Sequence, residues 1–441
     1  MIGLVKLFEP GYIGRIKVRN RIVMPGIQTR GADAEGFITE NLIDYYAERA
    51  RGGAGLIIVQ MSFAWPEARL KRGIGLWDDK FIPGLKKLAQ AVQCYGARIA
   101  IQIGSRGTNQ DEGVEEVAPS AVRASCREDV PRELTQEEIT SYIEAFAEAA
   151  RRVREAGFDA VEINGAHGHL ISQFLSPYTN RRTDEYGGSV VNRTRFACEI
   201  IKRIRAKVGP DFPILIRMNG DDFIEGGITI EDAIEQARLF EAAGVDALDV
   251  SGGCHETSWY VMPSYFFPQG HRVHLALPIK KAVNIPVITG GKINDPVFAE
   301  QILAEGKADF VAIGRAQVAD PEWANKAREG RFKDIRRCIY CCNCLTWERR
   351  PRLAERGFSC TVNPAVLRER EFVIKRAPQP KKVMVVGGGL AGMEAARVLA
   401  ERGHIVELYE KNDYLGGQWA IAAWPPTKPI TRPSSLTLHG V

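Results

Sequence analysis

The chain has 441 residues, of which 45% are hydrophobic and 26% are charged, and its formal net charge is +5. This is an ordinary globular composition, and the length predicts two or three domains. The charge is too small and too evenly spread to indicate nucleic-acid binding, and no apolar run reaches the roughly 18 residues that cross a bilayer. We therefore expect neither a nucleic-acid nor a membrane partner.

The first residues, MIGLVKLFEPGYIG, lack the charged region and apolar core of a secretory signal. Four of the nine cysteines are scattered singly, at Cys94, Cys126, Cys198 and Cys254. Isolated thiols are typical of a reducing compartment and not of a disulfide framework. A cytoplasmic location is therefore expected.

Eight short apolar runs alternate with amphipathic stretches between Asn20 and Arg315. The predicted strands are Arg21–Met24, Gly55–Gln60, Arg98–Ile103, Ala160–Ile163, Ile214–Met218, Ala247–Val250, Pro286–Thr289 and Phe310–Ile313. Continuous apolar strands are typical of parallel strands that are buried on both faces. Eight strand–helix units over roughly 300 residues favour an α/β fold of the (β/α)8 TIM-barrel class, and the count makes a doubly wound sheet the weaker alternative.

The amphipathic stretches predict helices between the strands. The predicted helices include Gln136–Ala156, Asn192–Val208, Thr229–Ala243 and Pro296–Glu305. Thr229 precedes acidic residues and is predicted to be a helix N-cap. Glycines follow three of these helices, at Gly157, Gly209 and Gly244, and are predicted C-caps.

Barrel enzymes carry their reacting groups at the C-terminal ends of the strands. Here those ends carry Pro25 and Gly26, Gln102, Asn164, His167 and His169, Arg217, His255, Gly290 and Gly291, and Gly314 and Arg315. Glycines after the seventh and eighth strands favour a phosphate held by backbone N–H groups, although each pair could equally form a simple turn. Gln102 and Arg217 could reach a planar heterocycle lying across the mouth. Three histidines at two strand ends favour a catalytic role over a structural one.

Five cysteines lie between Arg336 and Pro364. Three of them recur at every third position, a fourth follows after a gap, and Cys342 stands between two of the first three. Thiolates this dense converge on one metal centre and favour an iron–sulfur cluster or zinc. A zinc ribbon would more naturally show two separate C-x2-C pairs, so a [4Fe–4S] cluster is favoured.

A dinucleotide-binding pattern follows an extended basic stretch. It comprises the predicted strand Lys382–Val386, the glycines Gly387, Gly389 and Gly392, a helix to Arg402, the strand Ile405–Tyr409 and the acidic residue Glu410. A lone G-x-G-x-x-G is weak, but the strand, helix, second strand and terminal acid together make a specific fingerprint.

We expect three regions: a barrel over residues 1–335, an iron–sulfur segment and linker over 336–375, and an incomplete Rossmann-like βαβ unit over 376–441. Only some thirty residues follow Glu410, and the stretch from Trp424 to Pro433 has neither helical nor strand periodicity. A complete dinucleotide fold needs several further strands, so a truncated or frame-shifted product is expected.

Several motifs together resemble the old yellow enzyme-like flavin/iron–sulfur family that includes 2,4-dienoyl-CoA reductase and trimethylamine dehydrogenase. They are LFEPGYIGRIKVRNRIVMPG near the start, APSAV at Ala118–Val122, LTQEEI at Leu134–Ile139, GAHGHLISQFLSPYTNRRTDEYGGS at Gly165–Ser189 and LYEKNDYLGGQ at Leu408–Gln418, together with the cysteine run. The resemblance covers about residues 1–420. Members of this family continue through FAD-type and NAD(P)H-type regions, most of which this sequence lacks.

The resemblance implies FMN across the barrel mouth. Pro25, Gly26 and Ile27 would line one edge, Gln102 and Arg217 would bind the pyrimidine side, and Gly291, Gly314 and Arg315 would hold the phosphate. Cys338, Cys341, Cys344 and Cys360 would ligate the cluster, with Cys342 as a competing ligand. Electrons would come from NAD(P)H, with FAD as a further candidate cofactor, and pass singly through the cluster to FMN.

The sequence departs from the family at His169, where a tyrosine commonly donates the proton. A histidine with its ordinary pKa of about 6.5 could still donate a proton and switch near neutrality. Asn164 and His167 would polarise a substrate carbonyl or amine, and His255 matches a second acid. The cysteine spacing C-x2-C-x2-C is closer to the amine dehydrogenase than to the reductases.

Three hypotheses for the function stay open. The first is an FMN-dependent reductase of C=C bonds conjugated to a thioester or carbonyl, acting on a small-molecule substrate with NAD(P)H. The second is an amine dehydrogenase or N-demethylase that oxidises methylated amines, which an aromatic cage would favour. The third is an FMN-binding fragment that NAD(P)H cannot reduce. Association of identical chains is also left open.

Overall fold

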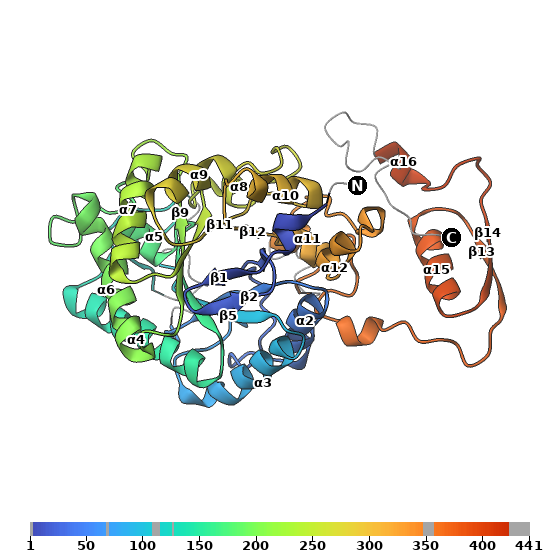
Figure 1. Ribbon diagram of the computed structural model, residues 1–441, viewed down its shortest axis with the longest axis horizontal. Coiled ribbons are helices and arrows are strands. Elements are labelled where there is room, and N and C mark those ends of the chain that lie inside the picture. Colours follow the sequence, from blue (N-terminus) through green and yellow to red (C-terminus); the bar gives the residue numbers. More distant parts are fainter. Residues whose placement is uncertain (1–2, 68–69, 108–114, 126–127, 347–356, 423–441) are drawn as a thin grey trace.

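The computed structural model describes residues 3–67, 70–107, 115–125, 128–346 and 357–422. Eight parallel strands close into a barrel with helices around it (Figure 1). The strands are β3 (Ile22–Met24), β4 (Leu56–Phe63), β5 (Arg98–Gly104), β8 (Ala160–Gly165), β9 (Ile214–Asn219), β10 (Ala247–Ser251), β11 (Val287–Thr289) and β12 (Phe310–Ala312). Strand β12 pairs with β3 and closes the barrel. The eight predicted strands and the TIM-barrel class are therefore confirmed.

The barrel helices follow the strands in chain order. They are α2 (Glu40–Arg51), α3 (Ile82–Gln93), α4 (Gln136–Glu155), α6 (Val190–Val208), α7 (Ile230–Ala243), α9 (Val273–Ala282), α10 (Pro296–Ala304), α11 (Arg315–Ala319) and α12 (Trp323–Arg328). The Thr229 side chain accepts a hydrogen bond from the Asp232 N–H and caps α7, as predicted. Gly209 and Gly244 follow their helices with φ of 76° and 103°, a region that glycine adopts without steric cost.

Shorter elements fill the remaining connections. They are α1 (Val5–Phe8), β1 (Gly11–Ile13), β2 (Ile16–Val18), β6 (Val117–Ala118), β7 (Arg132–Glu133), α5 (Leu170–Leu175), α8 (Ser258–Val261) and α13 (Asn343–Thr346). The β1–β2 hairpin packs Ile13 and Val18 into a buried cluster with inward side chains of the barrel strands, including Leu215 and Phe310. This cluster is a packed core that fills the barrel interior.

A second unit lies beside the barrel, at the right in Figure 1. Strands β13 (Lys382–Val386) and β14 (Ile405–Tyr409) pair in parallel, and α15 (Leu390–Glu401) connects them. The short helix α16 (Gln418–Ala422) follows. This is the predicted βαβ arrangement. Trp424 to Pro433, on which the expected truncation partly rested, lie outside the described residues.

Within the described residues, no helix combines the length and the apolar character needed to cross a membrane.

Candidate functional site

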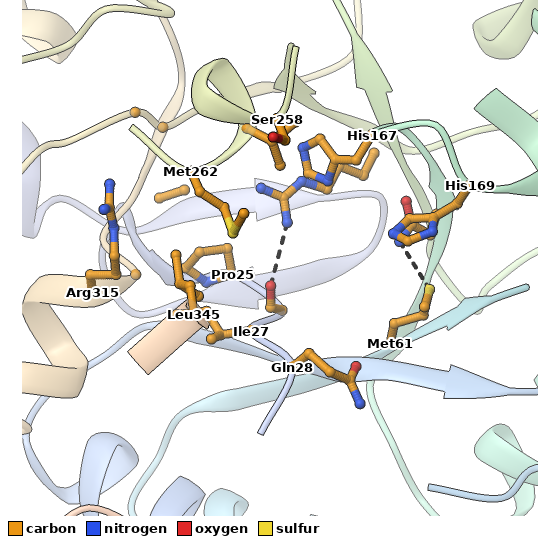
Figure 2. A pocket seen from close by; sticks show the side chains of 18 of the residues that line it. Pro25, Ile27, Gln28, Met61, His167, His169, Ser258, Met262, Arg315 and Leu345 are labelled. Carbon is orange, nitrogen blue, oxygen red and sulfur yellow. Dashed lines mark hydrogen bonds between the residues drawn. The ribbon is translucent and has the colours of Figure 1, made fainter. Parts of the chain in front are cut away.

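A cavity of about 750 Å³ opens at the C-terminal ends of the barrel strands. All thirteen residues that the sequence placed at this mouth line it: Pro25, Gly26, Ile27, Gln102, Asn164, His167, His169, Arg217, His255, Gly290, Gly291, Gly314 and Arg315. Figure 2 shows His167 and His169 at one end of the cavity and Arg315 at the other. The cavity is therefore chemically asymmetric, with imidazoles at one end and a guanidinium at the other.

A buried network of hydrogen bonds connects two of the predicted residues to Glu162 on β8. The Gln102 amide donates to Glu162 Oε2 and accepts from Asn164 Nδ2 at 3.0 Å. Burial, reinforced by the nearby Asp249 carboxylate, raises the pKa of Glu162 to about 8. Asn164 also donates to Met61 Sδ at 3.2 Å, so the amide donors of Asn164 are both occupied. The network fixes Gln102 and Asn164 at the cavity wall.

Arg217 at the end of β9 faces a buried carboxylate. Its Nε lies 3.3 Å from Asp249 Oδ2, and its NH1 donates to the Gly26 carbonyl at 3.4 Å. Burial raises the pKa of Asp249, and the guanidinium partly offsets that effect. Asp249 therefore holds the Arg217 guanidinium at the mouth, next to the backbone that was predicted to line one edge of the cofactor.

The three predicted histidines gather at one end of the cavity. The ring centroids of His167 and His169 are 6.5 Å apart, and those of His169 and His255 are 6.0 Å apart. Burial, followed by the charges of neighbouring groups, lowers the pKa of both His167 and His169 well below 6.5. The expectation that His169 switches near neutrality is therefore wrong, because burial disfavours its cationic form. Both rings are neutral at pH 7.

The opposite end of the cavity is cationic. Arg315 donates to the Pro263 carbonyl at 2.6 Å, and its guanidinium lies 4.8 Å from the centroid of the Tyr340 ring. Lys292 Nζ lies 5.0 Å from the same ring. Both cations stand beside the predicted Gly291 and Gly314 in the cavity wall. This end can hold an anionic group such as a phosphate.

Arg272, near the start of α9, is a cavity residue that the sequence analysis missed. It is 5% exposed, and burial together with Arg217 and Arg315 lowers its pKa to about 9. Its guanidinium donates to Ser251 Oγ and to the Val261 carbonyl. No carboxylate forms an ion pair with it in the described part of the chain, so the cavity contains a buried cation without an anionic partner.

These observations test whether FMN fits the cavity. Buried cations without partners are costly, and a phosphate in the cavity would compensate them. Gln28 lines the cavity with both polar atoms of its amide buried and without a partner among the described residues. Gln102 and Arg217 supply donors on the wall for a heterocycle. The residues therefore fit a flavin mononucleotide, with its phosphate at the Arg315 end.

The cysteine segment lies against the barrel, beside Arg315. The thiols of Cys338, Cys341, Cys344 and Cys360 are close enough to affect one another's ionisation, and the pKa of Cys344 is raised well above 9 by burial and then by these neighbours. As they stand, the described residues contain no group of three or more His, Cys, Asp or Glu side chains arranged to hold a single metal ion.

Cys342 points elsewhere than the other four thiols. Its Sγ accepts a hydrogen bond from Arg315 at 3.3 Å and lies 3.5 Å from the Met262 carbonyl oxygen. Tyr340 and Cys342 both have positive φ, 51° and 57°, which turns this loop sharply between Cys338 and Cys344. The loop therefore directs the Cys342 thiol toward Arg315 and the Met262 carbonyl, while Cys341 lies close enough to raise the pKa of Cys342.

The glycine fingerprint is assembled in the second unit. A Cβ added at Gly392 would lie 1.8 Å from the Gly387 carbonyl oxygen, so only glycine fits this close approach of helix and strand. Gly387 has φ of 101°. Glu410 Oε2 accepts a hydrogen bond from the Gly388 N–H at 2.7 Å, and hydrogen bonds from backbone N–H groups lower the pKa of Glu410. Gly389, at the N-cap of α15, completes the loop.

Six residues of the site had no motif to reveal them: Glu162, Asp249, Arg272, Tyr340, Lys292 and Gln28. The first two were visible as carboxylates inside otherwise apolar strands, which is a usable signal because a buried charge needs a partner. Arg272 and Tyr340 gave no such signal, because their positions depend on how α9 and the cysteine segment fold over the mouth.

Two family models match this chain. The NADH:flavin oxidoreductase / NADH oxidase family matches residues 6–334, and the NAD(P)-binding Rossmann-like domain matches residues 385–426. An NADH oxidase of Thermoanaerobacter brockii is 50% identical over 430 residues, covering 96% of this chain and 66% of the relative. This chain thus spans about two thirds of the length of that relative.

Two solved structures are similar over nearly the whole chain. The structure of 2-naphthoyl-CoA reductase with 2-naphthoyl-CoA has a TM-score of 0.93 at 34% identity, covering 99% of this chain and 68% of the other. Histamine dehydrogenase from Rhizobium sp. 4-9 has a TM-score of 0.88 at 30% identity, covering 97% and 63%. One of these neighbours is named for a thioester and the other for an amine.

Proposed function

Since the chain belongs to the NADH:flavin oxidoreductase / NADH oxidase family, we propose that it binds FMN and reduces C=C bonds conjugated to a thioester or carbonyl, with electrons from NAD(P)H. The observation that carries this proposal is the lining of the cavity, which has neutral imidazoles at one end, Arg315 and Lys292 at the other, and Arg272 bonded to Ser251 beside His167. When bound, FMN supplies the hydride. The small-molecule substrate would enter the same cavity.

The residues of the cavity divide into holding groups and reacting groups. Pro25, Gly26, Ile27, Gln102, Arg217, Gly291, Gly314 and Arg315 would hold the cofactor. His167 would donate a hydrogen bond to the substrate oxygen and stabilise the charge that develops there. Asn164 would exchange its bond to Met61 Sδ for a second hydrogen bond to the same oxygen. His169 or His255 would give a proton to the substrate carbon. Because His169 is neutral at pH 7, its proton comes from a neutral imidazole and leaves an anion that the nearby arginines stabilise.

We also propose that Cys338, Cys341, Cys344 and Cys360 hold a [4Fe–4S] cluster, which when bound supplies one-electron transfer. The mutual influence of the four thiols supports a shared centre. The spacing of these cysteines favours this cluster over zinc, because zinc ribbons more naturally have two separate C-x2-C pairs. The fingerprint around Gly387, Gly389, Gly392 and Glu410 supports a dinucleotide at the second unit. FAD at this unit and a cytoplasmic location stay predictions.

The amine dehydrogenase is the second candidate, favoured by the likeness to histamine dehydrogenase. An amine site would be expected to surround a cationic group with aromatic rings. The aromatic side chains of the described cavity lining are Trp259 and Tyr340, and the Tyr340 ring already lies against Arg315 and Lys292. The cationic lining therefore favours the reductase.

Anaerobic half-reactions separate the candidates. The protein is loaded with FMN and reduced by dithionite, then mixed with crotonyl-type or dienoyl-type thioesters; the reductase predicts flavin reoxidation and a saturated product. Oxidised protein mixed with methylated amines should stay oxidised. Reduction by dithionite but not by NADH or NADPH would identify the third hypothesis, a fragment that pyridine nucleotides cannot reduce.

Single substitutions test whether the reaction takes place in the cavity. Replacing His167 by Phe should slow reoxidation by the thioester about 100-fold, because a donor to the developing oxyanion is lost. His274→Gln, on an exposed position of α9, is the matched control and should react as the unmodified chain does. Reduction of the flavin by amines, with no reoxidation by thioesters, would overturn the proposal.

A further inference from the structure

His167 is held in an unusual conformation at the end of β8. Its φ is 66°, a region that costs free energy for a residue with a side chain. Its backbone N–H donates to Asn219 Oδ1 at 3.3 Å, and its ring Nε2 lies 2.6 Å from Ser251 Oγ. The ring therefore has one nitrogen committed to the protein and can use only Nδ1 toward a ligand in the cavity.

Arg272 determines the direction of the bond between Ser251 and His167. A guanidinium can only donate, so Ser251 Oγ accepts from Arg272 NH1. The serine has a single hydroxyl proton, and within the described residues its other hydrogen-bond partner is His167 Nε2. If Nε2 carried a proton, Ser251 Oγ would accept from both groups, and its own buried hydroxyl proton would have no acceptor among the described residues. The bonding therefore favours a hydroxyl proton that points to an unprotonated Nε2.

The Arg272 guanidinium cannot turn away from Ser251. Arg272 is buried, and its NH2 donates to the Val261 carbonyl at 2.9 Å while its Nε faces His271 Nε2 at 3.2 Å. Three contacts on different atoms fix the plane of the guanidinium. Ser251 is also fully buried, at the end of β10, so water does not replace either partner.

We propose that Arg272 and Ser251 keep the proton of His167 on Nδ1, so that this histidine presents a hydrogen-bond donor to the cavity. Arg272 and Ser251 are then positioning residues that act through His167. The consequence for the substrate rests on the proposed function. A neutral ring with a proton on Nδ1 binds an acceptor, such as the oxygen of a thioester, carbonyl or carboxylate, and offers nothing to an ammonium group.

Nitrogen NMR of the purified full chain tests the proton position without any substrate. The seven histidines are labelled with ¹⁵N, and His167→Gln identifies the signals of His167. Long-range ¹⁵N–¹H correlations distinguish protonated from unprotonated ring nitrogens. The expected result is a protonated Nδ1 and an unprotonated Nε2 for His167. A proton on Nε2 would overturn the proposal.

Four variants test the two positioning residues. Ser251→Ala and Arg272→Gln should shift His167 toward a mixture of the two neutral forms, because the donor to Nε2 is lost or free to rotate. Ser251→Thr and Arg272→Lys keep the hydroxyl and the cation and should preserve the wild-type signals. His274→Gln is the folding and labelling control. An unchanged proton position in both Ser251→Ala and Arg272→Gln would contradict the mechanism.

The proton position on His167 and the proposed reductase function can fail separately. In anaerobic reoxidation with a conjugated thioester, Ser251→Ala should be about tenfold slower than Ser251→Thr, as expected for loss of a group that orients a reacting histidine. If NMR finds the proton on Nδ1 but thioesters do not react with any form, the reductase assignment fails and the proton assignment stands. If thioesters react but Nε2 carries the proton, the present inference alone is wrong.

Discussion

Glu162 is a carboxyl group inside the barrel, and its ionisation is coupled to the stability of the fold. It is fully buried on β8, and its pKa is raised to about 8 by burial and by Asp249. In the unfolded chain the same group titrates near 4.3. The folded protein therefore holds a proton that the unfolded chain releases between these two pH values.

We predict that this group makes the protein less stable as the pH rises from about 4.3 to about 8. Its contribution is fully present below the lower value and is lost as the pH passes the upper one. Glu162→Gln should raise the free energy of unfolding at pH 8 by about 4 kcal/mol and at pH 5 by only about 1 kcal/mol. Denaturant unfolding at the two pH values measures this difference.

The control for this prediction is Glu235→Gln, an exposed carboxylate on α7. It should change the stability by less than about 0.5 kcal/mol at either pH. Equal effects of Glu162→Gln at pH 5 and pH 8 would show that Glu162 does not titrate in this range.

At the scale of elements, neighbouring thiols of the cysteine segment have different contacts. Cys344 is buried among the other three predicted ligands, whereas Cys342 contacts Arg315 and the Met262 carbonyl. Sequence spacing could not distinguish them, because both lie within the same run. The sharp turn at Tyr340 and Cys342 separates them in space.

We predict that Cys344→Ser removes the proposed iron–sulfur cluster and Cys342→Ser does not, because only Cys344 belongs to the proposed ligand set. Iron analysis after anaerobic reconstitution should give about four iron atoms per chain for Cys342→Ser and close to none for Cys344→Ser. Loss of iron in both variants would assign Cys342 to the cluster.

The glycine loop of the second unit supports a matched pair of substitutions. A Cβ at Gly392 would meet the Gly387 carbonyl at 1.8 Å, whereas a Cβ at Gly389 meets nothing within 4 Å and Gly389 has φ of −73°. Gly392→Ala should therefore separate α15 from β13 and expose residues 382–409 to hydrogen exchange at least about tenfold faster. Gly389→Ala should exchange as the unmodified chain does, and similar exchange in the two variants would contradict the close approach.

At the scale of the whole molecule, the residues after the cysteines are attached to the barrel. Arg49 on α2 is fully buried, and its NH1 lies 2.6 Å from Glu369 Oε1. The Phe358 and Tyr45 rings are 6.0 Å apart in an edge arrangement, and Asn363 donates to the Val318 carbonyl. The cysteine segment is therefore enclosed between the barrel and residues that bind back to it.

We predict that Glu369→Ala destabilises the protein by about 3 kcal/mol, because it leaves the Arg49 guanidinium buried without its partner. Thermal or denaturant unfolding measures the loss. Glu371→Ala, which removes a partner of the exposed Arg368, is the control and should cost less than about 1 kcal/mol. A loss as small as that of the control would mean that the buried pair does not fasten this segment.

Much of the site was predictable because two local rules apply to it. Parallel strands buried on both faces are continuous apolar runs, and barrel chemistry lies where those runs end. Those rules predicted that Gln102, Asn164, Arg217 and the three histidines lie at one mouth, although these residues are separated by up to 153 positions in the sequence. The βαβ unit was equally local, since its glycines, strands and acidic residue lie within about 30 positions.

The sequence by itself determined the barrel, the cysteine run and the glycine fingerprint, because periodicity and spacing act over a few neighbouring residues. Only the tertiary structure decided the low pKa of His169, the separation of Cys342 from the other thiols and the contact of Arg272 with Ser251 and His167. Each of these depends on burial or on distances between segments far apart in the chain. Ionisation and proton position respond to that environment, which no local pattern specifies.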